Sequence, residues 1–324
     1  GLLDNLTLTL NGNQLSCVED AVSTAAYGTN TAFVNGASVA GEYAYDANGN
    51  LTKDLNKGIT DIQYNVLNLP STVSFSDGST ITYTYGADGT KLRTVHKIGS
   101  TTTTTDYCGN VIYENGTQKL LLTEEGYINL TGTQQYHYYL KDHQGNNRVV
   151  INQSGTVEET NHYYPFGGVF GTAGNTQPYK YNGKELDTKK GLNWYDYGAR
   201  HYDTALGRFT TNDRFAEKYY SMSPYQYGAN SPVVNIDVNG DSIRICTETQ
   251  SFGHTWISVG EGSNMTVYSY GRYNGTNKGP DRSSNSLGNG SGVLLKLMGD
   301  EAKAYNDKKS SWWNVCICSN RCGR

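Results

Sequence analysis

The feature that most constrains the fold is a repeat of about twenty residues. Three consecutive units begin at residues 41, 61 and 81, and their anchor tyrosines Tyr45, Tyr64 and Tyr85 are 19 and 21 residues apart. A degenerate earlier copy covers residues 7–21. Each unit reads as two strands with alternating aromatic or apolar residues, joined by a turn. Because one hairpin cannot bury its apolar face alone, neighbouring units must stack side by side into one sheet.

The turns of this repeat are marked by glycine dipeptides. Asn-Gly stands at 48–49, and Asp-Gly stands at 77–78 and at 88–89. These dipeptides are typical of type I′ hairpin turns, in which both central residues take a positive φ. The 324 residues include 38 Gly and 27 Tyr but only 6 Pro, so the composition also favours strands and tight turns. We therefore predict a mainly β fold.

Charge and cysteine usage exclude several classes of function. The net charge is −4 and no basic stripe occurs, so nucleic-acid binding is disfavoured. No run of 18 apolar residues occurs, so no membrane-spanning helix is predicted. The six cysteines are widely spaced except for Cys316, Cys318 and Cys322, which form neither a CxxC pair nor a cluster with histidine. We predict no metal site and no cofactor.

Several motifs along residues 1–241 resemble one known family in the same order. "YAYDANGNLT" (43–52) is similar to the YD repeat of the RHS proteins, and "YYLKDHQGNNRVV" (138–150) is similar to a conserved segment of their shell, with Gln144 where leucine is usual. "YYPFGGVF" (163–170), "YKYNGKELDTKKGLNWYDYGARHYDTALGRFTTND" (179–213) and "SPYQYGANSPVVNIDVNGD" (223–241) resemble the end of that shell. The motifs "GKELD" and "NGD" are most similar to those of the Bacteroidetes members of the family.

The resemblance implies a fold and a division into domains. RHS shells are spiral β-sheets that wrap into a hollow cocoon around a C-terminal toxin domain. We expect a spiral or curved antiparallel sheet of YD repeats, a partial RHS cocoon, with a small α+β C-terminal domain. The expected domains are a YD-repeat shell over 1–135, an RHS-associated core and plug over 136–241, and a toxin-like, incomplete domain over 242–324. Because the first residues read as the middle of a repeat and the repeats are too few to close a cocoon, we expect a segment of a longer protein with an exposed sheet edge.

The same resemblance implies a function in toxin delivery. The shell would encapsulate or present its own C-terminal cargo domain in interbacterial competition or secretion. The implied partners are that cargo domain, a secretion machinery and an immunity protein, and the implied location is secreted or on the bacterial cell surface. This first hypothesis gives the shell no chemistry of its own, and two enzymatic alternatives stay open.

The segment at 138–167 contains Lys141, Asp142, His143 and Arg148 within eight residues. Asp142 and His143 are residue types that could form an acid–base pair. The alternative is a turn whose polar side chains cap backbone groups, with Lys141 and Arg148 in solvent. Because the family places this segment in the shell wall, we interpret it as a turn.

One enzymatic alternative is self-cleavage at the junction after the core, as in RHS relatives that cut their own chain in an aspartyl-protease-like way. Such chemistry needs two carboxylates close enough to share a proton. Asp213 and Asp237 match the family's acidic positions, and Arg208 would pack or pair beside them. Val238 replaces the family's proline and Asp241 replaces its leucine, so Asp213 and Asp237 could equally be turn residues that hold a plug. The structural core motif consists of Gly207, Arg208, Phe209 and Gly240.

The other alternative is a hydrolase in the C-terminal domain. His254 precedes an alternating run over 255–259, a partner strand is predicted over 263–275, and a further strand followed by a short helix is predicted near Gly299 and Asp300. A histidine on a strand with a later cysteine resembles permuted papain-like hydrolases, in which Cys322 would be the nucleophile. Cys322 lacks the following helix that such a nucleophile needs, and His254 is otherwise a plain strand residue.

Overall fold

The computed structural model describes residues 3–22, 32–218, 220–241, 244–247, 255–259, 266–271, 293–298 and 300. The chain divides into two compact units, residues 1–227 and 228–324. Strands predominate over helices among the described residues of both units, so the predicted mainly β fold is confirmed. The domain boundaries expected after residues 135 and 241 stay a prediction. In the structure the main sheet continues across residue 135, because the strands on either side of it pair with each other.

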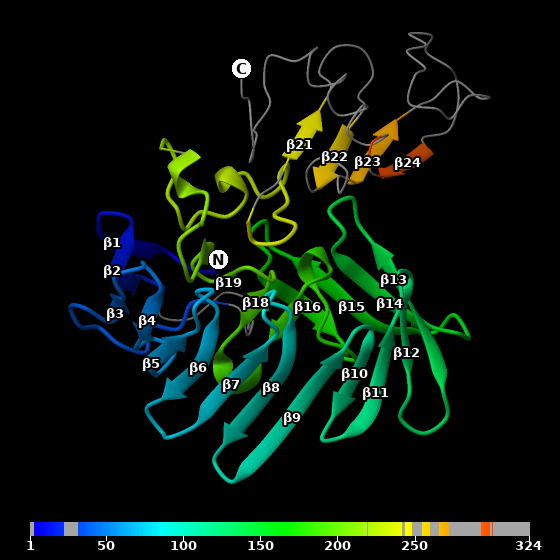
Figure 1. Cartoon of the computed structure of the whole chain (residues 1–324), viewed down its shortest axis with the longest axis horizontal. Coiled ribbons are helices and arrows are strands. Elements are labelled where there is room, and N and C mark those ends of the chain that lie inside the picture. The colour runs from blue at the N-terminus through cyan, green and yellow to red at the C-terminus, as the bar shows by residue number, and fades with distance from the viewer. Residues whose placement is uncertain are drawn as a thin grey trace. The chain divides into compact units, whose positions relative to one another are not determined.

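The first unit is built on one antiparallel sheet of 14 strands in which every strand pairs with its neighbours along the chain (Figure 1). The strands are β3 (Tyr43–Tyr45), β4 (Leu51–Asp54), β5 (Ile59–Tyr64), β6 (Pro70–Phe75), β7 (Thr80–Tyr85), β8 (Lys91–Ile98), β9 (Thr101–Cys108), β10 (Val111–Glu114), β11 (Thr117–Leu122), β12 (Gly126–Asn129), β13 (Gln135–Lys141), β14 (Asn147–Asn152), β15 (Val157–Tyr163) and β16 (Val169–Ala173). A separate hairpin, β1 (Leu6–Asn11) and β2 (Gln14–Asp20), corresponds to the degenerate first copy of the repeat.

Each twenty-residue repeat forms one pair of neighbouring strands, as the period predicts. The anchor tyrosines Tyr45, Tyr64 and Tyr85 end β3, β5 and β7 and pack against the same core cluster. The hydroxyl of Tyr64 donates a hydrogen bond to the carbonyl of Leu51 in the preceding repeat (2.7 Å). Tyr64 thus ties its own hairpin to the preceding one.

The turns differ from the type I′ prediction, which is wrong for all three dipeptides. Gly49, Gly78 and Gly89 have φ values of 78°, 82° and 86°, but the residue before each is not among the positive-φ residues. The amide of Gly49 donates to the carbonyl of Asp46 (3.0 Å), and the carboxylate of Asp46 accepts the amides of Asn48 (2.9 Å) and Asn50 (2.8 Å). This pattern is that of a type I turn followed by a glycine in the left-handed region, which the aspartate side chain stabilises.

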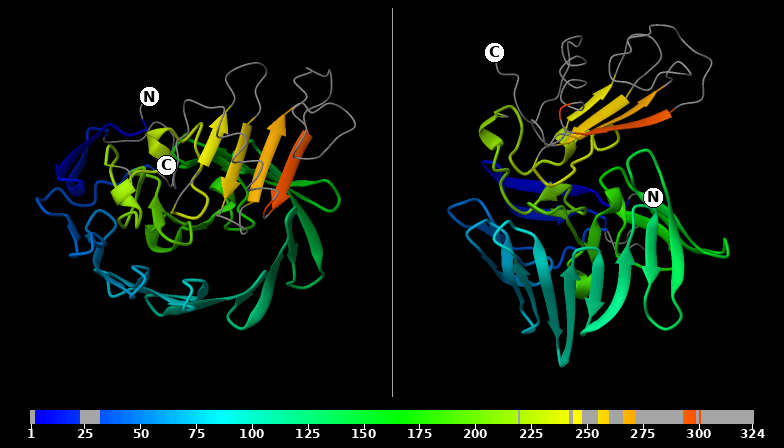
Figure 2. Two further views of the ribbon diagram at one scale, coloured as in Figure 1. Left: turned by 45° about the horizontal axis from the view of Figure 1, so that its top comes forward. Right: turned by 45° about the vertical axis from the view of Figure 1, so that its right-hand side comes forward.

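A small sheet lies against the concave face of the large one, and Figure 2 shows the large sheet curved around it. Its strands are β17 (Glu185–Asp187), β18 (Trp194–Asp196), β19 (His201–Asp203) and β20 (Arg208–Phe209), with short 3-10 turns at Tyr181–Gly183, Lys189–Gly191 and Ala216–Lys218. Leu192 and Trp194 of this segment are buried in the same cluster as the inward residues of β3–β7. The core of the first unit therefore lies between the wall and the motif-rich segment that follows it.

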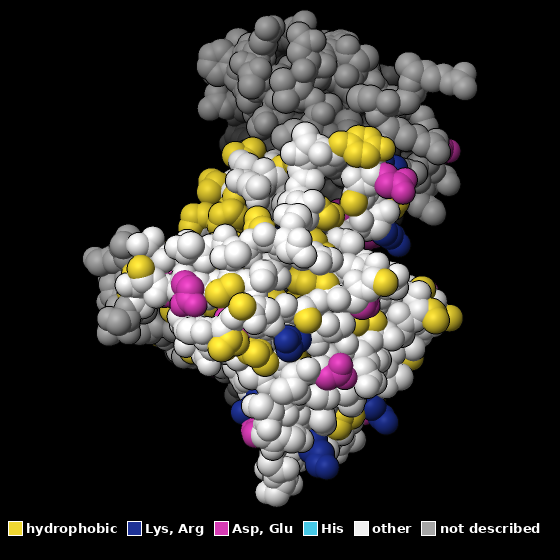
Figure 3. All heavy atoms as spheres, turned by 90° about the vertical axis from the view of Figure 1, so that its left-hand side faces the viewer, with side chains coloured by type: hydrophobic (Ala, Val, Ile, Leu, Met, Phe, Trp, Pro, Cys, Tyr) yellow, Lys and Arg dark blue, Asp and Glu magenta, His cyan; other side chains and the backbone are white. Residues whose placement is uncertain are grey.

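Tyrosines fill much of this interior. One cluster joins Tyr181, Tyr195, Tyr197, Tyr202 and Tyr227, all of them at most 1% exposed. Their rings meet edge-to-face or tilted, for example at 5.7 Å between Tyr197 and Tyr227. On the face of the molecule that Figure 3 shows, charged side chains are few among uncharged polar and hydrophobic ones, in keeping with a charged content of 17%.

The second unit begins with a 3-10 turn at Gly228–Asn230 and contains a four-stranded antiparallel sheet. Its strands are β21 (Arg244–Thr247), β22 (Thr255–Val259), β23 (Thr266–Gly271) and β24 (Val293–Met298). The strand predicted over 255–259 and its antiparallel partner are confirmed. Asp300 is helical, as predicted, and the residues after it lie outside the described part of the chain.

Candidate functional site: a polar cavity behind the wall

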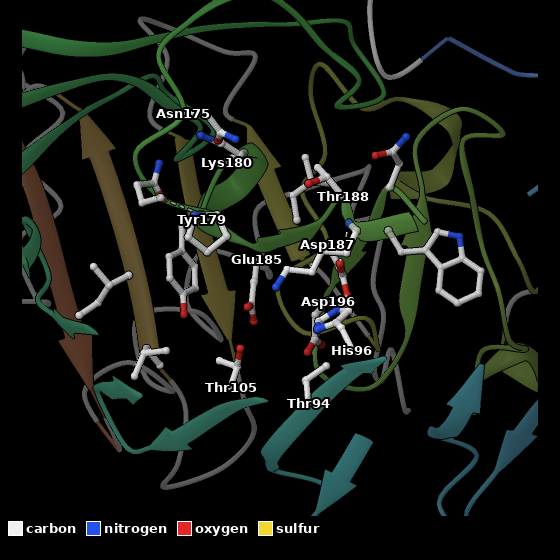
Figure 4. A pocket seen from close by; sticks show the side chains of 18 of the residues that line it. Thr94, His96, Thr105, Asn175, Tyr179, Lys180, Glu185, Asp187, Thr188 and Asp196 are labelled. Atoms are coloured by element: carbon white, nitrogen blue, oxygen red, sulfur yellow. Dashed lines mark hydrogen bonds and ion pairs between the residues drawn. The ribbon is translucent and has the colours of Figure 1, made fainter. Parts of the chain in front are cut away.

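A cavity of about 580 Å³ lies in the first unit between the concave wall and the core segment (Figure 4). The wall contributes inward residues of β7–β11, among them Tyr83, Lys91, Thr94, His96, Thr105 and Tyr107. The opposite side comes from residues 169–180 and from β17 and β18. Side chains alternate along a regular strand, so Thr94 and His96 of β8 and Thr105 and Tyr107 of β9 point into this space.

Lys91 carries the main ionic contact across the cavity. Its ammonium lies 2.8 Å from a carboxylate oxygen of Glu185 and 2.5 Å from one of Asp196. Burial by itself lowers the pKa of Lys91, but the two carboxylates outweigh it and hold that pKa well above its ordinary value. Burial likewise opposes ionisation of Asp196, yet Lys91 brings the pKa of Asp196 far below its usual range. Lys91 and Asp196 are therefore charged, and the contacts of Lys91 with Glu185 and Asp196 fasten β17 and β18 to β8.

A second contact lies beside the first. The Nε2 atom of His96 is 2.7 Å from a carboxylate oxygen of Asp187. The hydroxyl of Tyr107 donates to Glu185 (2.8 Å), and the ammonium of Lys91 lies 4.5 Å from the centre of the Tyr107 ring. Because each carboxylate of this cluster already faces a cation or a strong donor, the arrangement is suited to holding two layers together rather than to moving protons.

Some polar atoms that line the cavity, three on the wall and one on β19, have no hydrogen-bond partner among the described residues. They are the hydroxyls of Tyr83 and Thr94, the Nδ1 atom of His96 and the Nδ1 atom of His201. All four side chains line the cavity and are at most 7% exposed. Burial lowers the pKa of His201 and so favours its neutral form. A polar, roomy space lined by such groups is one that water or a polar guest can occupy.

A buried pair closes the far end of the cavity. Lys180 lies 2.5 Å from Glu159, whose side chain is fully buried. Glu159 also accepts the amide of Thr176 (2.7 Å) and the side-chain amide of Gln177 (3.1 Å). Burial would raise the pKa of Glu159, but Lys180 outweighs it and the pKa is lowered. This pair fixes the connection between β16 and β17 on the inside of β15.

The segment with Asp142 and His143 is a structural turn, as interpreted from the sequence. The carboxylate of Asp142 accepts the amides of Gln144 (3.0 Å) and Asn146 (3.1 Å). His143 is exposed. The turn also binds the core: Asn182 donates its side-chain amide to the carbonyl of Gln144 (3.0 Å) and accepts two tyrosine hydroxyls at 2.6 Å each. A backbone-capping role therefore accounts for these residues.

The predicted junction residues lie in different units. Asp213 belongs to the first unit, where it pairs with Arg200 (3.1 Å) and accepts the amide of Phe215 (2.8 Å). Asp237 belongs to the second unit, is 5% exposed and accepts the amide of Gly240 (2.6 Å). Both aspartates hold local turns, and their role in cleavage stays a prediction.

The core motif around Gly207 is packed rather than open. Phe209 is buried with the tyrosine cluster, and Gly207 has a φ of 64°. The arginine paired with Asp213 is Arg200, which also lies 3.8 Å from the centre of the Phe209 ring. Arg208 instead donates to the carbonyl of Asn13 and lies over the Tyr225 ring. His254 and Cys322 lie outside the described residues, so their predicted catalytic roles remain predictions.

The ionic cluster of Lys91, Glu185, Asp187, Asp196 and His96 was not anticipated from the sequence. A signal was present, because Glu185 and Asp187 stand two apart in a short strand and so share one face. Thr94 and His96 share a face of β8 in the same way. No local sequence pattern, however, indicates that these two faces meet, because Lys91 and Glu185 are 94 residues apart in the chain.

In the part of the chain that the structure describes, no group of three or more His, Cys, Asp or Glu residues could hold a metal ion. Within the same residues, no helix has the length and apolar character needed to cross a membrane. The sheet topology and the cavity together define a class of architecture: a curved wall of antiparallel hairpins with a core segment and a polar cavity on its concave side.

Comparison with known proteins identifies this architecture as an RHS-like β fold. The crystal structure of TcdB2-TccC3-Cdc42 matches with a TM-score of 0.55 at 19% identity, over 73% of this chain and 13% of that chain. That of TcdB2-TccC3 matches with a TM-score of 0.52 at 19% identity, over 72% and 13%. The fold is thus that of the RHS-containing shells of Tc toxins.

The chain is also similar in sequence to one further protein. Salivary gland surface protein 1 of Aedes aegypti is 34% identical over 224 residues, which cover 60% of this chain and 6% of that protein. No family model matches the chain. The chain thus spans 6% of the length of this relative and 13% of each of the two crystallised chains named above.

Proposed function

We propose that this chain is a segment of an RHS-type shell that encloses or presents a C-terminal toxin or effector. The single observation that carries the proposal is the continuous, curved wall of 14 strands, because such a sheet is what the wall of a container requires. The cavity of about 580 Å³ is much smaller than the 83 residues of 242–324, so it would accommodate only a short stretch of the guest. The RHS-like fold supports the same role, since the matched structures are toxin complexes.

In this proposal the guest is the chain's own C-terminal part, residues 242–324. The setting is interbacterial competition or secretion, with an export machinery and an immunity protein as the further partners and a secreted or cell-surface location. The proposed role requires no catalysis by the wall itself. Its ion pairs would keep the core segment attached to the concave face, beside the cavity.

A photo-crosslinking experiment on the full chain tests the enclosure. Thr105 lines the cavity, whereas its neighbour Thr104 pairs with Val95 on the opposite face of the sheet. We expect p-benzoylphenylalanine at position 105 to crosslink to residues 242–324, and the same group at position 104 to give no such product. Equal yields from both positions, or no product from either, would contradict the proposal.

Self-cleavage at the core junction is a second candidate, favoured by the burial of Asp237 four residues before residue 241. In this candidate Asp213 and Asp237 share a proton and cut the chain near residue 241. The intact mass of the purified chain should then show two fragments, and Asp213→Asn should leave one uncut chain. A single intact mass for the parent chain would exclude it.

The predicted C-terminal hydrolase is tested separately. If His254 and Cys322 form a nucleophilic pair, expression of the chain should inhibit growth of a host, and His254→Ala and Cys322→Ala should each abolish that inhibition. Toxicity that survives both substitutions would rule out this pair.

A further inference from the structure

The outward face of the 14-stranded sheet changes its chemistry halfway along. On β5–β9 the outward positions are mainly threonines, serines and charged residues, as in the pairs of Thr80 with Lys97 and Arg93 with Asp106, with Val95 as an apolar exception. An antiparallel sheet with one solvated face is expected to carry polar residues outside. The first half of the wall therefore has an ordinary water-facing surface.

On β10–β14 the outward positions are mostly apolar instead, although Gln118 pairs with Tyr113 on the same face. Leu121 pairs with Ile128, Ile128 with Tyr136, and Tyr138 with Ile151. These residues and Leu140, which shares a face with Tyr138, form a stripe that we call the outer patch (Leu121, Ile128, Tyr136, Tyr138, Leu140, Ile151). The paired outward positions of β10–β14 include no charged residue.

Half of the outer patch is exposed to solvent, and its other residues, Leu121, Ile128 and Ile151, are half-buried. Tyr136, Tyr138 and Leu140 expose 49%, 42% and 51% of their surface. Single exposed apolar residues are common on proteins, but a contiguous patch that continues over neighbouring strands marks an interaction site. Tyrosine enrichment and the absence of charge are also the composition found in the buried centre of protein interfaces.

We propose that the outer patch is the interface of a homodimer, in which two copies of this chain pack sheet against sheet. Because its paired positions carry no charge, the patch fits an uncharged apolar partner, and the same patch on a second copy meets that requirement. Two aligned sheets pack face to face in many proteins, and one patch used twice gives a closed twofold pair.

The size of the patch is consistent with a dimer. With the flanking Val111, Val149 and Val157, the apolar area is on the order of 500 Å², at the upper end for a monomer. Two copies would together bury on the order of 1,000 Å², the size at which specific interfaces begin. We therefore expect a reversible dimer with a dissociation constant in the micromolar range.

Sedimentation velocity of the full chain over a concentration series tests the dimer. We expect the mass to rise from one copy to two and then to level off. The double variant Tyr138→Lys/Leu140→Glu should weaken association at least tenfold, and the control Thr82→Lys/Thr104→Glu, on the polar half of the same face, should leave it unchanged. A monomer at all concentrations, growth beyond two copies, or equal effects of both variants would overturn the proposal.

A crosslinking measurement separates the dimer from other occupants of the patch. With p-benzoylphenylalanine at position 138, the proposal predicts adducts between two copies, identified in a mixture of isotopically light and heavy chains. Adducts confined to residues 228–324 of the same chain would show that the patch is covered internally and would overturn it. Because residue 138 is exposed, this substitution leaves the interior of the wall unchanged.

Discussion

Replacing Lys91 by methionine tests whether the ion pairs fasten the core segment to the wall. The substitution keeps the length of the side chain but leaves the carboxylates of Glu185 and Asp196 without their cation. Loss of one partner from a buried ion pair costs about 3–5 kcal/mol. Since Lys91, Glu185 and Asp196 retain 13%, 19% and 16% exposure, we expect the lower end, about 3 kcal/mol.

Amide hydrogen exchange measures this effect where it occurs. Exchange in residues 185–196 should be roughly 100-fold faster in Lys91→Met, because 1.36 kcal/mol corresponds to a factor of ten. The matched control is Lys97→Met on the same strand, where the side chain points outward, and it should change stability by less than about 0.5 kcal/mol. If both variants exchange alike, the ionic cluster does not hold the two layers together.

The pH dependence of the difference has a definite sign. The pKa of Asp196 is lowered in the folded chain, so its contribution is present above the ordinary aspartate pKa of about 4 and is lost as the pH falls below it. The destabilisation by Lys91→Met should therefore shrink in acid. In addition, the triple variant with Glu185→Gln and Asp196→Asn should recover most of the lost stability, since no uncompensated charge remains.

Three further predictions address other parts of the first unit. Burial raises the pKa of Asp54 to about 6. The folded chain is therefore favoured by the neutral carboxyl below pH 4, and about 3 kcal/mol of unfolding free energy is lost as the pH rises through 6. Urea unfolding of Asp54→Asn should lack this pH dependence. Gly167 has a φ of 88°, and an added Cβ would lie 2.6 Å from the Tyr181 ring. Gly167→Ala should therefore lower the free energy of unfolding by about 3 kcal/mol in the same assay. The control Gly155→Ala, where φ is 79° and the space is open, should lower it by about 1 kcal/mol. Asn182→Ala removes the acceptor of two tyrosine hydroxyls and should lower the melting temperature by about 6 °C; an unchanged melting temperature would contradict its docking role.

The strands and their order were predictable because their causes are local. Alternation of apolar residues and the period of the anchor tyrosines indicate hairpins without reference to distant residues. The turns were located correctly but assigned the wrong type. An aspartate or asparagine that accepts amides two and four residues later favours a type I turn, as at Asp46 and Asn152. This preference competes with the tendency of Asn-Gly and Asp-Gly to form type I′ turns.

The site could be predicted only in part. The RHS-like motifs marked the core segment, and the structure places that segment on the concave side of the wall. The residues that join the two were missed, because Lys91 and Glu185 are far apart in the chain and each alone resembles a solvated charge. Arg200 and Arg208 show the same limit. Both lie in the motif-rich segment 179–213, and only the packing decides that Arg200 is the partner of Asp213.

The sequence by itself determined a stack of hairpins, since strand alternation and turn hydrogen bonds act within a few residues. The tertiary structure decided which faces meet. Curvature brings β8 against β17 and β18 and so converts separate charges into ion pairs, and strand register gathers single apolar residues of β11–β14 into the outer patch. Both results depend on distances across strands, which a linear pattern does not contain.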